Sequence, residues 1–177
     1  MAAKNVFIQT IGCQMNVYDS ERIGELMSRT GYEVVDSADQ ADLVIVNTCA
    51  IRDKAEQKLY SLLGRLAPLK QQNPDMILAV GGCVAQQEGA AMLVRVRCLD
   101  LVFGTDALHR LPGLVDRITL KKTRIVDVGP RASSQDHQHF EGLISGGSVS
   151  LFVTIMRGCD NYCTYCVVPI VRGRETS

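Results

Sequence analysis

Three cysteines lie close together near the end of the chain, in the stretch MRGCDNYCTYC at residues 156–166. Cys159, Cys163 and Cys166 have the spacing Cys-x3-Cys-x2-Cys and follow an apolar run over residues 150–156. Zinc sites in proteins usually take four ligands in two pairs, whereas three thiolates on one loop can bind three irons of a 4Fe-4S cluster. The fourth iron of such a cluster stays open for chemistry.

Simpler interpretations of these loop cysteines (Cys159, Cys163 and Cys166) are a partial zinc knuckle, a disulfide with one thiol left over, or cysteines buried in a core. The cluster interpretation is favoured because three ligands after a predicted strand form a more restrictive motif than a single Cys-x-x-Cys.

A second set, Cys13, Cys49 and Cys83, is spread through the first half of the chain. Each of these residues follows an apolar segment that has the length of a buried strand. Because ligands of open parallel sheets bind at the carboxyl ends of the strands, we expect the three thiols to converge there. Neighbouring Gly, Asn and Thr residues permit tight turns and direct backbone N-H groups towards sulfur. The alternative is that each cysteine simply fills space at a strand end.

The elements that would position these cysteines alternate between apolar strands and amphipathic helices. This alternation predicts an α/β fold, with a parallel sheet covered by helices on both faces. The expected strands cover residues 6–11, 32–35, 41–46, 76–80 and 99–103, with a possible edge strand at 124–128. Helices are expected over residues 20–29, 85–94 and 106–118, the last with Asp106 as N-cap. The longest helix starts near Ala50 and is expected to end or bend at Pro68 or Pro74.

Composition narrows the class of protein. The 19 basic and 19 acidic residues cancel, so net charge gives no sign of a nucleic-acid surface. The N-terminus lacks the features of a signal peptide and no apolar run is long enough to span a membrane, so we expect a cytoplasmic protein without membrane contact. In that compartment seven cysteines indicate metal or redox chemistry. Cys98 is expected to be the odd, structural one.

The loop motif resembles that of the radical S-adenosylmethionine (SAM) superfamily. The resemblance implies that the loop cysteines bind a 4Fe-4S cluster, whose free iron is chelated by the amino and carboxylate groups of SAM. Tyr165 stands where that superfamily places an aromatic ring near the adenine of SAM.

With Cys13, Cys49 and Cys83 included, the chain resembles the methylthiotransferases, radical-SAM enzymes that carry two 4Fe-4S clusters; these three cysteines are the implied ligands of the auxiliary cluster. The stretches IGCQMNVYDSE, NTCAIRDKAEQK, GGCVAQ and MRGCDNYCTYCVVPIVRGRE are similar to the branch that makes 2-methylthio-N6-isopentenyladenosine in tRNA. The residues Gln14-Met15-Asn16 favour this branch over those that modify threonylcarbamoyladenosine or an aspartate of a ribosomal protein.

The resemblance implies an enzyme that inserts a methylthio group at C2 of the modified adenosine beside the anticodon. Its partners would be the tRNA substrate and an electron donor such as flavodoxin or ferredoxin, and we expect a monomer. Arg172 and Arg174 are cations near the cluster loop that could contact SAM or RNA, or form a surface pair. Two other functions stay open: a methylthiotransferase for one of the other substrates, and a non-enzymatic iron-sulfur or zinc module.

We expect three parts along the chain. Residues 1–122 form the N-terminal α/β domain, and residues 123–148 a linker with the possible edge strand. Residues 149–177 form the first strand and cluster loop of an incomplete radical-SAM TIM-like barrel, which would need several further β/α units to close. We therefore expect a fragment of a longer enzyme that is inactive alone, with residues 149–177 poorly supported.

Overall fold

The computed structural model describes residues 3–51, 54–129 and 154–177, and at its centre lies a sheet of six parallel strands. The strands are β1 (Lys4–Ile11), β2 (Tyr32–Val34), β3 (Leu43–Thr48), β4 (Ile77–Gly82), β5 (Leu101–Phe103) and β6 (Ile125–Asp127). Their order is β2-β1-β3-β4-β5-β6. The connection after β1 leads to β2 on one side of the sheet, whereas the connection after β3 leads to β4 on the other side. The place between β1 and β3 is therefore the switch point, where open parallel sheets bind ligands.

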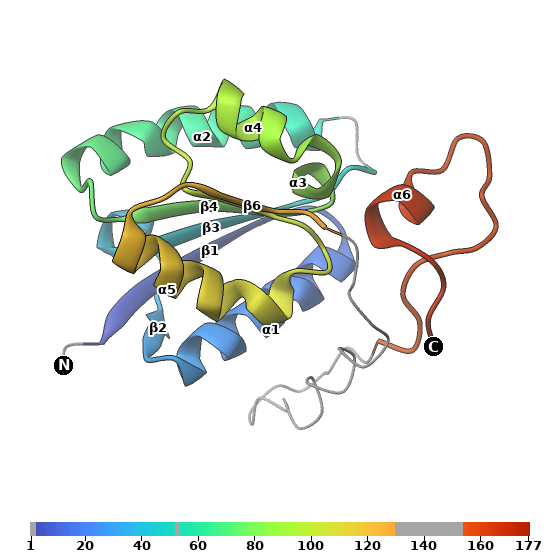
Figure 1. Ribbon diagram of the computed structural model, residues 1–177, viewed down its shortest axis with the longest axis horizontal. Coiled ribbons are helices and arrows are strands. Elements are labelled where there is room, and N and C mark those ends of the chain that lie inside the picture. The colour runs from blue at the N-terminus through green and yellow to red at the C-terminus, as the bar shows by residue number, and fades with distance from the viewer. Residues whose placement is uncertain (1–2, 52–53, 130–153) are drawn as a thin grey trace.

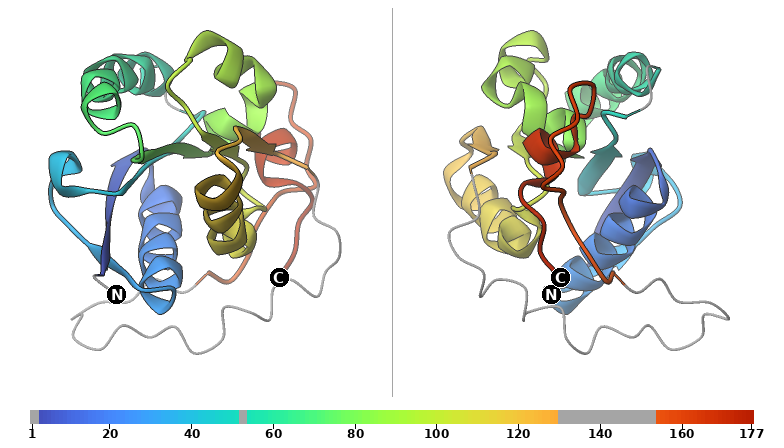
Figure 2. Two further views of the ribbon diagram at one scale, coloured as in Figure 1. Left: turned by 60° about the vertical axis from the view of Figure 1, so that its left-hand side comes forward. Right: turned by 90° about the vertical axis from the view of Figure 1, so that its right-hand side faces the viewer.

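Helices cover both faces of the sheet, with α1 and α5 on one face and α2 and α4 on the other (Figures 1 and 2). The helices are α1 (Gln14–Arg29), α2 (Ala55–Gln72), α3 (Cys83–Glu88), α4 (Ala90–Arg95), α5 (Leu111–Lys121) and α6 (Val168–Arg172), with short 3-10 helices at Ala38–Gln40 and Leu108–Arg110. The predicted α/β architecture is confirmed. None of the described helices is both long and apolar enough to cross a membrane.

Successive side chains of the central strands enter two separate cores. Leu43 and Ile45 of β3 pack in the core beneath α1 and α5, whereas Val44 and Val46 pack in the core beneath α2 and α4. Every residue of β3 and β4 is buried. Burial on both faces explains why these strands are continuous apolar runs without alternation.

Several helices differ from the sequence prediction, and α1, for example, begins at Gln14 where the sequence predicts residue 20. The sequence predicts that the longest helix ends or bends at Pro68 or Pro74; α2 runs through Pro68 and ends at Gln72, shortly before Pro74. Pro68 and Gly64 are both exposed, so water can replace the hydrogen bond that the Gly64 carbonyl loses to the proline. The single helix predicted over residues 85–94 is divided into α3 and α4, because Gly89 has a φ of +50° and interrupts the helical path.

The prediction of a helix from Asp106 is also wrong. The α-helix begins at Leu111, where Pro112 favours a helix start. β6 lies within the expected linker, at the edge of the sheet. The strand expected over residues 150–156 lies partly outside the described residues, and residues 154–156 form no strand.

Residues 154–177 pack against the sheet domain through α6, which lies against α3 (Figure 2). Val171 is buried, and its carbonyl oxygen accepts a hydrogen bond of 2.6 Å from Oγ1 of Thr105. Nη2 of Arg157 donates to the carbonyl oxygen of Thr105 at 3.2 Å. α6 is therefore packed on the sheet domain, while the expectation of a poorly supported segment stays a prediction for protease protection to test.

Candidate metal centre

The sheet-edge cysteines (Cys13, Cys49 and Cys83) all lie at the C-terminal ends of strands. Cys13 is the N-cap of α1, Cys49 directly follows β3, and Cys83 is the first residue of α3, directly after β4. β1, β3 and β4 are neighbours in the sheet, so the three thiols come from adjacent strand ends at the switch point. Cys49 and Cys83 are buried and Cys13 is half-buried.

The three thiols influence one another electrostatically. Burial raises the pKa of the Cys49 thiol, and the neighbouring Cys13 and Cys83 raise it further, because each thiolate disfavours the next. The backbone N-H of Ile51, 3.4 Å from Sγ of Cys49, opposes this effect. A cationic group at this place, such as a metal centre, would favour the thiolate of Cys49.

Two glycines let the cysteine-bearing segments approach one another. A Cβ atom on Gly12 would lie 2.8 Å from Cβ of Cys49. Gly82, whose φ is +92°, passes so close to β3 that a Cβ atom would lie 2.3 Å from the carbonyl oxygen of Thr48. A larger residue at either position would force the strand ends apart, so glycine is required here for the thiols to converge.

Two buried asparagines connect α1 to the end of β3. Nδ2 of Asn16 donates to Oδ1 of Asn47 at 3.1 Å and to the carbonyl oxygen of Thr48 at 2.8 Å. Oδ1 of Asn16 accepts from the backbone N-H of Cys13 at 3.3 Å. Nδ2 of Asn47 in turn donates to the carbonyl oxygen of Asn16 at 2.9 Å. These bonds hold Cys13 in place relative to the strand that precedes Cys49.

α6 carries Arg172 into the same site. Its Nη1 atom lies 2.8 Å from Oδ2 of Asp19, and the two side chains are 6% and 5% exposed. The contact has the distance of an ion pair without the angle of a hydrogen bond, since among the described residues neither terminal nitrogen of Arg172 has a hydrogen-bond partner. Burial by itself lowers the pKa of this guanidinium, but Asp19 and the thiol of Cys83 outweigh it and keep the pKa above the ordinary arginine value. Arg172 is therefore a fixed cation beside Cys83.

The sequence analysis did not identify Asn16 and Asp19 as site residues. Both polar side chains lie on the buried face of α1, at helical spacing with Ile23 and Met27. A polar residue within the apolar face of a helix is the signal that could have identified them, because buried polar groups need partners. For Arg172 the sequence showed only a cation near the loop, and no pattern indicated its burial.

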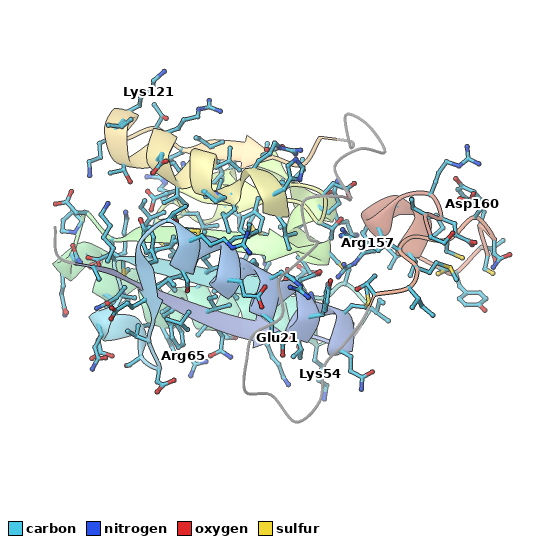
Figure 3. The ribbon with its side chains drawn as sticks, turned by 90° about the horizontal axis from the view of Figure 1, so that it is seen from below. Glu21, Lys54, Arg65, Lys121, Arg157 and Asp160 are labelled. Atoms are coloured by element: carbon cyan, nitrogen blue, oxygen red, sulfur yellow. The ribbon has the colours of Figure 1, made fainter. Side chains whose placement is uncertain are left out.

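The loop cysteines lie beyond α6, on a segment that projects away from the sheet (Figures 1 and 3). Cys163 is exposed, whereas Cys159 and Cys166 are half-buried. Tyr165 is 91% exposed, so the described residues form no pocket around its ring. The two cysteine sets therefore occupy separate places, joined by the short helix α6.

Backbone contacts close the base of this loop. The backbone N-H of Arg157 donates to the carbonyl oxygen of Thr176 at 2.9 Å, and the reverse bond measures 2.8 Å. Gly158, with a φ of +77°, passes so close to Arg174 that a Cβ atom would lie 2.1 Å from its carbonyl oxygen. Arg174 forms an exposed ion pair of 3.2 Å with Asp160, one of the roles considered for it from the sequence. The loop is thus anchored at its base and open at its tip.

The sheet-edge cysteines offer three thiols, which is the ligand type of iron-sulfur clusters. Among the described residues, no group of three or more His, Cys, Asp or Glu side chains surrounds a point where one ion could bind. A 4Fe-4S cluster binds each thiolate through a different iron, so its ligands stand farther apart than those of one ion. The backbone N-H of Ile51 is directed towards Sγ of Cys49 and favours a thiolate there, and the guanidinium of Arg172 lies beside Cys83.

The chain is similar to curated bacterial proteins named tRNA-2-methylthio-N(6)-dimethylallyladenosine synthase. It is 54% identical to the one from Desulfosudis oleivorans, over 98% of this chain and 37% of the relative. It is 50% identical to the one from Syntrophotalea carbinolica, over 98% of this chain and 40% of the relative. For the one from Erwinia tasmaniensis the identity is 47%, over 98% of this chain and 36% of the relative.

This chain thus spans less than half of the length of these relatives. They confirm the resemblance to the isopentenyladenosine branch that the motifs indicate. A family profile matches residues 5–104, a range that contains all three sheet-edge cysteines. On that match the chain belongs to the family described as Uncharacterized protein family UPF0004.

Proposed function

We propose that this chain contributes the auxiliary-cluster domain and the radical-SAM loop of a tRNA methylthiotransferase, which inserts a methylthio group at C2 of N6-isopentenyladenosine. The observation that carries the proposal is the gathering of Cys13, Cys49 and Cys83 at the switch point of the sheet. The 54% identity to a synthase named for this tRNA product supports the choice of substrate.

In this proposal the sheet-edge cysteines hold one 4Fe-4S cluster and the loop cysteines hold the other, which binds SAM. When bound, these cofactors supply the radical and the sulfur chemistry. Residues 149–177 contribute the first unit of a TIM-like barrel of the radical-SAM type.

The side chains around the sheet-edge cysteines hold these cysteines in position for the cluster. Asn16 fixes the position of Cys13, and Arg172 places a positive charge beside Cys83. The burial of Cys49 and Cys83 limits the access of water and oxygen to their sulfur atoms.

The loop has the exposure that its proposed partners need. Tyr165 is free to stack on the adenine of SAM. The exposed side of the loop at Cys163 gives a reduced flavodoxin or ferredoxin a route for electron delivery. The tRNA substrate completes the set of partners.

Anaerobic iron-sulfur reconstitution of this chain tests the two-cluster assignment. We expect about eight irons per chain, and about four when Cys49→Ala removes a ligand of the sheet-edge set. Cys98→Ala is the matched control, because Cys98 lies outside both sets, and it should leave the iron content unchanged. Stable zinc uptake without an iron chromophore would instead establish a structural zinc module.

A chimera tests the substrate. This chain replaces the matching residues of the Desulfosudis oleivorans relative, and the chimera is expressed in a bacterial strain that lacks its own synthase gene. Mass analysis of tRNA nucleosides should detect 2-methylthio-N6-isopentenyladenosine. Cys49→Ala should abolish this nucleoside while SAM cleavage continues. Methylthiolated tRNA from the Cys49→Ala chimera would refute the division of roles between the two sets.

A further inference from the structure

An open groove of about 510 Å³ lies between α2 and β1. Its charged lining residues are all cations: Lys54, Lys58 and Arg65. In the described parts of the chain none of the three has an ion-pair partner, and no carboxylate lines the groove. The whole chain has equal numbers of acidic and basic residues, so the groove is a local concentration of positive charge.

The three cations follow one side of α2. Lys58 lies about one turn after Lys54, and Arg65 about two turns further, so the row extends over roughly 16 Å of helix axis. Figure 3 shows Lys54 and Arg65 on the same side of the molecule. All three side chains are exposed and spread along the helix, without converging on one point. This arrangement suits an extended polyanion and does not suit a small anion.

The remaining lining residues favour a nucleic acid over an acidic polypeptide. Gln9, Gln57 and Ser61 present amide and hydroxyl groups that can bond sugars and base edges, and Ile11 and Leu62 add apolar surface for the face of a base. Cations for phosphates, combined with uncharged polar and apolar contacts between them, are what surfaces for single-stranded nucleic acid provide.

The groove begins beside the sheet-edge cysteines. Ile11 pairs in register with Thr48, and these two residues lie just before Cys13 and Cys49. We propose that the groove binds the phosphate backbone of an RNA strand on its way to the metal centre. This inference rests on the proposed function and extends it, because it names the surface of this chain that holds the RNA.

Salt-dependent binding of a fluorescent RNA hairpin to this chain tests the inference. The groove variant replaces all three groove cations by Ala. The control variant removes the same charge elsewhere, from the exposed residues Arg29, Arg117 and Lys121. Because each phosphate contact to a single strand contributes about 0.7 to the slope of log K against log salt, the groove variant should lower the slope by about 2. If the wild type and the groove variant bind equally at 1 M salt, this difference in slope makes the groove variant bind roughly a hundredfold more weakly at 0.1 M.

The control variant should keep the wild-type slope, and a hairpin with a scrambled loop should give the same loss as the original, because phosphate contacts carry no sequence information. Equal effects of the two variants would overturn the inference, as would an unchanged slope in the groove variant. The assignment to RNA would be overturned if poly-glutamate bound the wild type as tightly as RNA does and this binding were lost in the groove variant.

The outcome is separable from that of the proposed function. RNA binding is measured without SAM or reductant, whereas the cluster assignment depends on iron content. Normal iron content with an unchanged slope in the groove variant would refute the groove alone. Failure to bind iron with groove binding intact would refute the cluster assignment alone. All three groove cations are exposed, so the variant should fold, and circular dichroism checks this.

Discussion

The buried ion pair between Arg172 and Asp19 predicts that residues 154–177 undock when either charge is removed. The pair has an Nη1 to Oδ2 distance of 2.8 Å, and the two side chains are 6% and 5% exposed. Arg172→Ala or Asp19→Ala leaves the surviving charge buried without its partner, which typically costs about 3–5 kcal/mol. Separation of α6 from the sheet domain relieves that cost, because it exposes the surviving charge to water.

The loss should therefore appear as local opening, with the sheet intact. When α6 leaves its position, the surviving charge reaches water, and the free energy of docking falls by about the cost of the unpaired charge. Since about 1.4 kcal/mol corresponds to a factor of ten, a loss of about 3 kcal/mol raises the open population by roughly a hundredfold. Stability of the core strands, which are buried on both faces, should change little.

Hydrogen exchange measured by mass spectrometry follows this opening. In α6 the backbone N-H groups of Ile170 and Val171 donate hydrogen bonds to the carbonyl oxygen of Val167, and a helix of five residues does not persist once it leaves the sheet domain. In either single variant we expect their protection to fall by about a hundredfold. Peptides from β3 and β4 should exchange at the wild-type rate.

Two further variants make the test specific. Arg174→Ala removes an ion pair whose side chains are 82% and 37% exposed, and should leave the protection of α6 close to the wild-type level because water screens this pair. Replacing the buried pair by Arg172→Met with Asp19→Leu removes both charges together and should restore most of the protection. If the single variants exchanged no faster than Arg174→Ala, the buried pair would not be what docks the segment.

Two other predictions follow from the site and from α2. Gly82→Ala should lower the stability of the protein in urea and its iron uptake more than Gly31→Ala does. Both glycines have positive φ, +92° and +89°, but a Cβ atom has open space at Gly31, whereas at Gly82 it would lie 2.3 Å from the carbonyl oxygen of Thr48. Equal losses in the two variants would mean that the close approach at Gly82 is unimportant. Burial, and to a lesser extent the hydrogen bond to the Glu88 carboxylate, raises the pKa of Tyr60 to about 12. The neutral Tyr60 side chain therefore contributes its full share to stability below about pH 10, and this contribution is lost as the pH rises through 12. Ultraviolet titration of the phenolate should give that midpoint, and Glu88→Gln should move it towards 10; an unmoved midpoint would leave burial as the only cause.

The sheet and the positions of its cysteines could be predicted because they depend on local patterns. β3 and β4 are apolar throughout since both of their faces are buried, and Cys49 and Cys83 directly follow them. In α2 the rule that ends a helix at proline holds at Pro74 but not at Pro68. It counts the hydrogen bond lost at Pro68 but not the apolar side chains, such as Leu59 and Leu63, that hold the helix on the core.

The contacts around the cysteines could not be predicted in the same way. Arg172 and Asp19 lie far apart in the sequence, and each taken alone resembles an ordinary surface charge. Their pairing depends on where α6 docks, which is decided by the burial of Val171 and the hydrogen bond from Thr105. Long-range packing of this kind leaves no period in the sequence, whereas strands and helices do.

The position of α6 couples the two cysteine sets. Cys166 lies two residues before α6, and Arg172, beside Cys83, is its last residue, so about 7 Å of helix separates the loop from the buried pair. Under the proposed function, iron bound by the loop cysteines orders the loop and favours the docked position of Arg172. Docking must then favour iron binding by the same factor, because coupling between two binding events is reciprocal. Arg172→Ala should therefore weaken iron retention by the loop cysteines although Arg172 is not one of their ligands, and retention equal to that of Arg174→Ala would show that the two sets assemble independently.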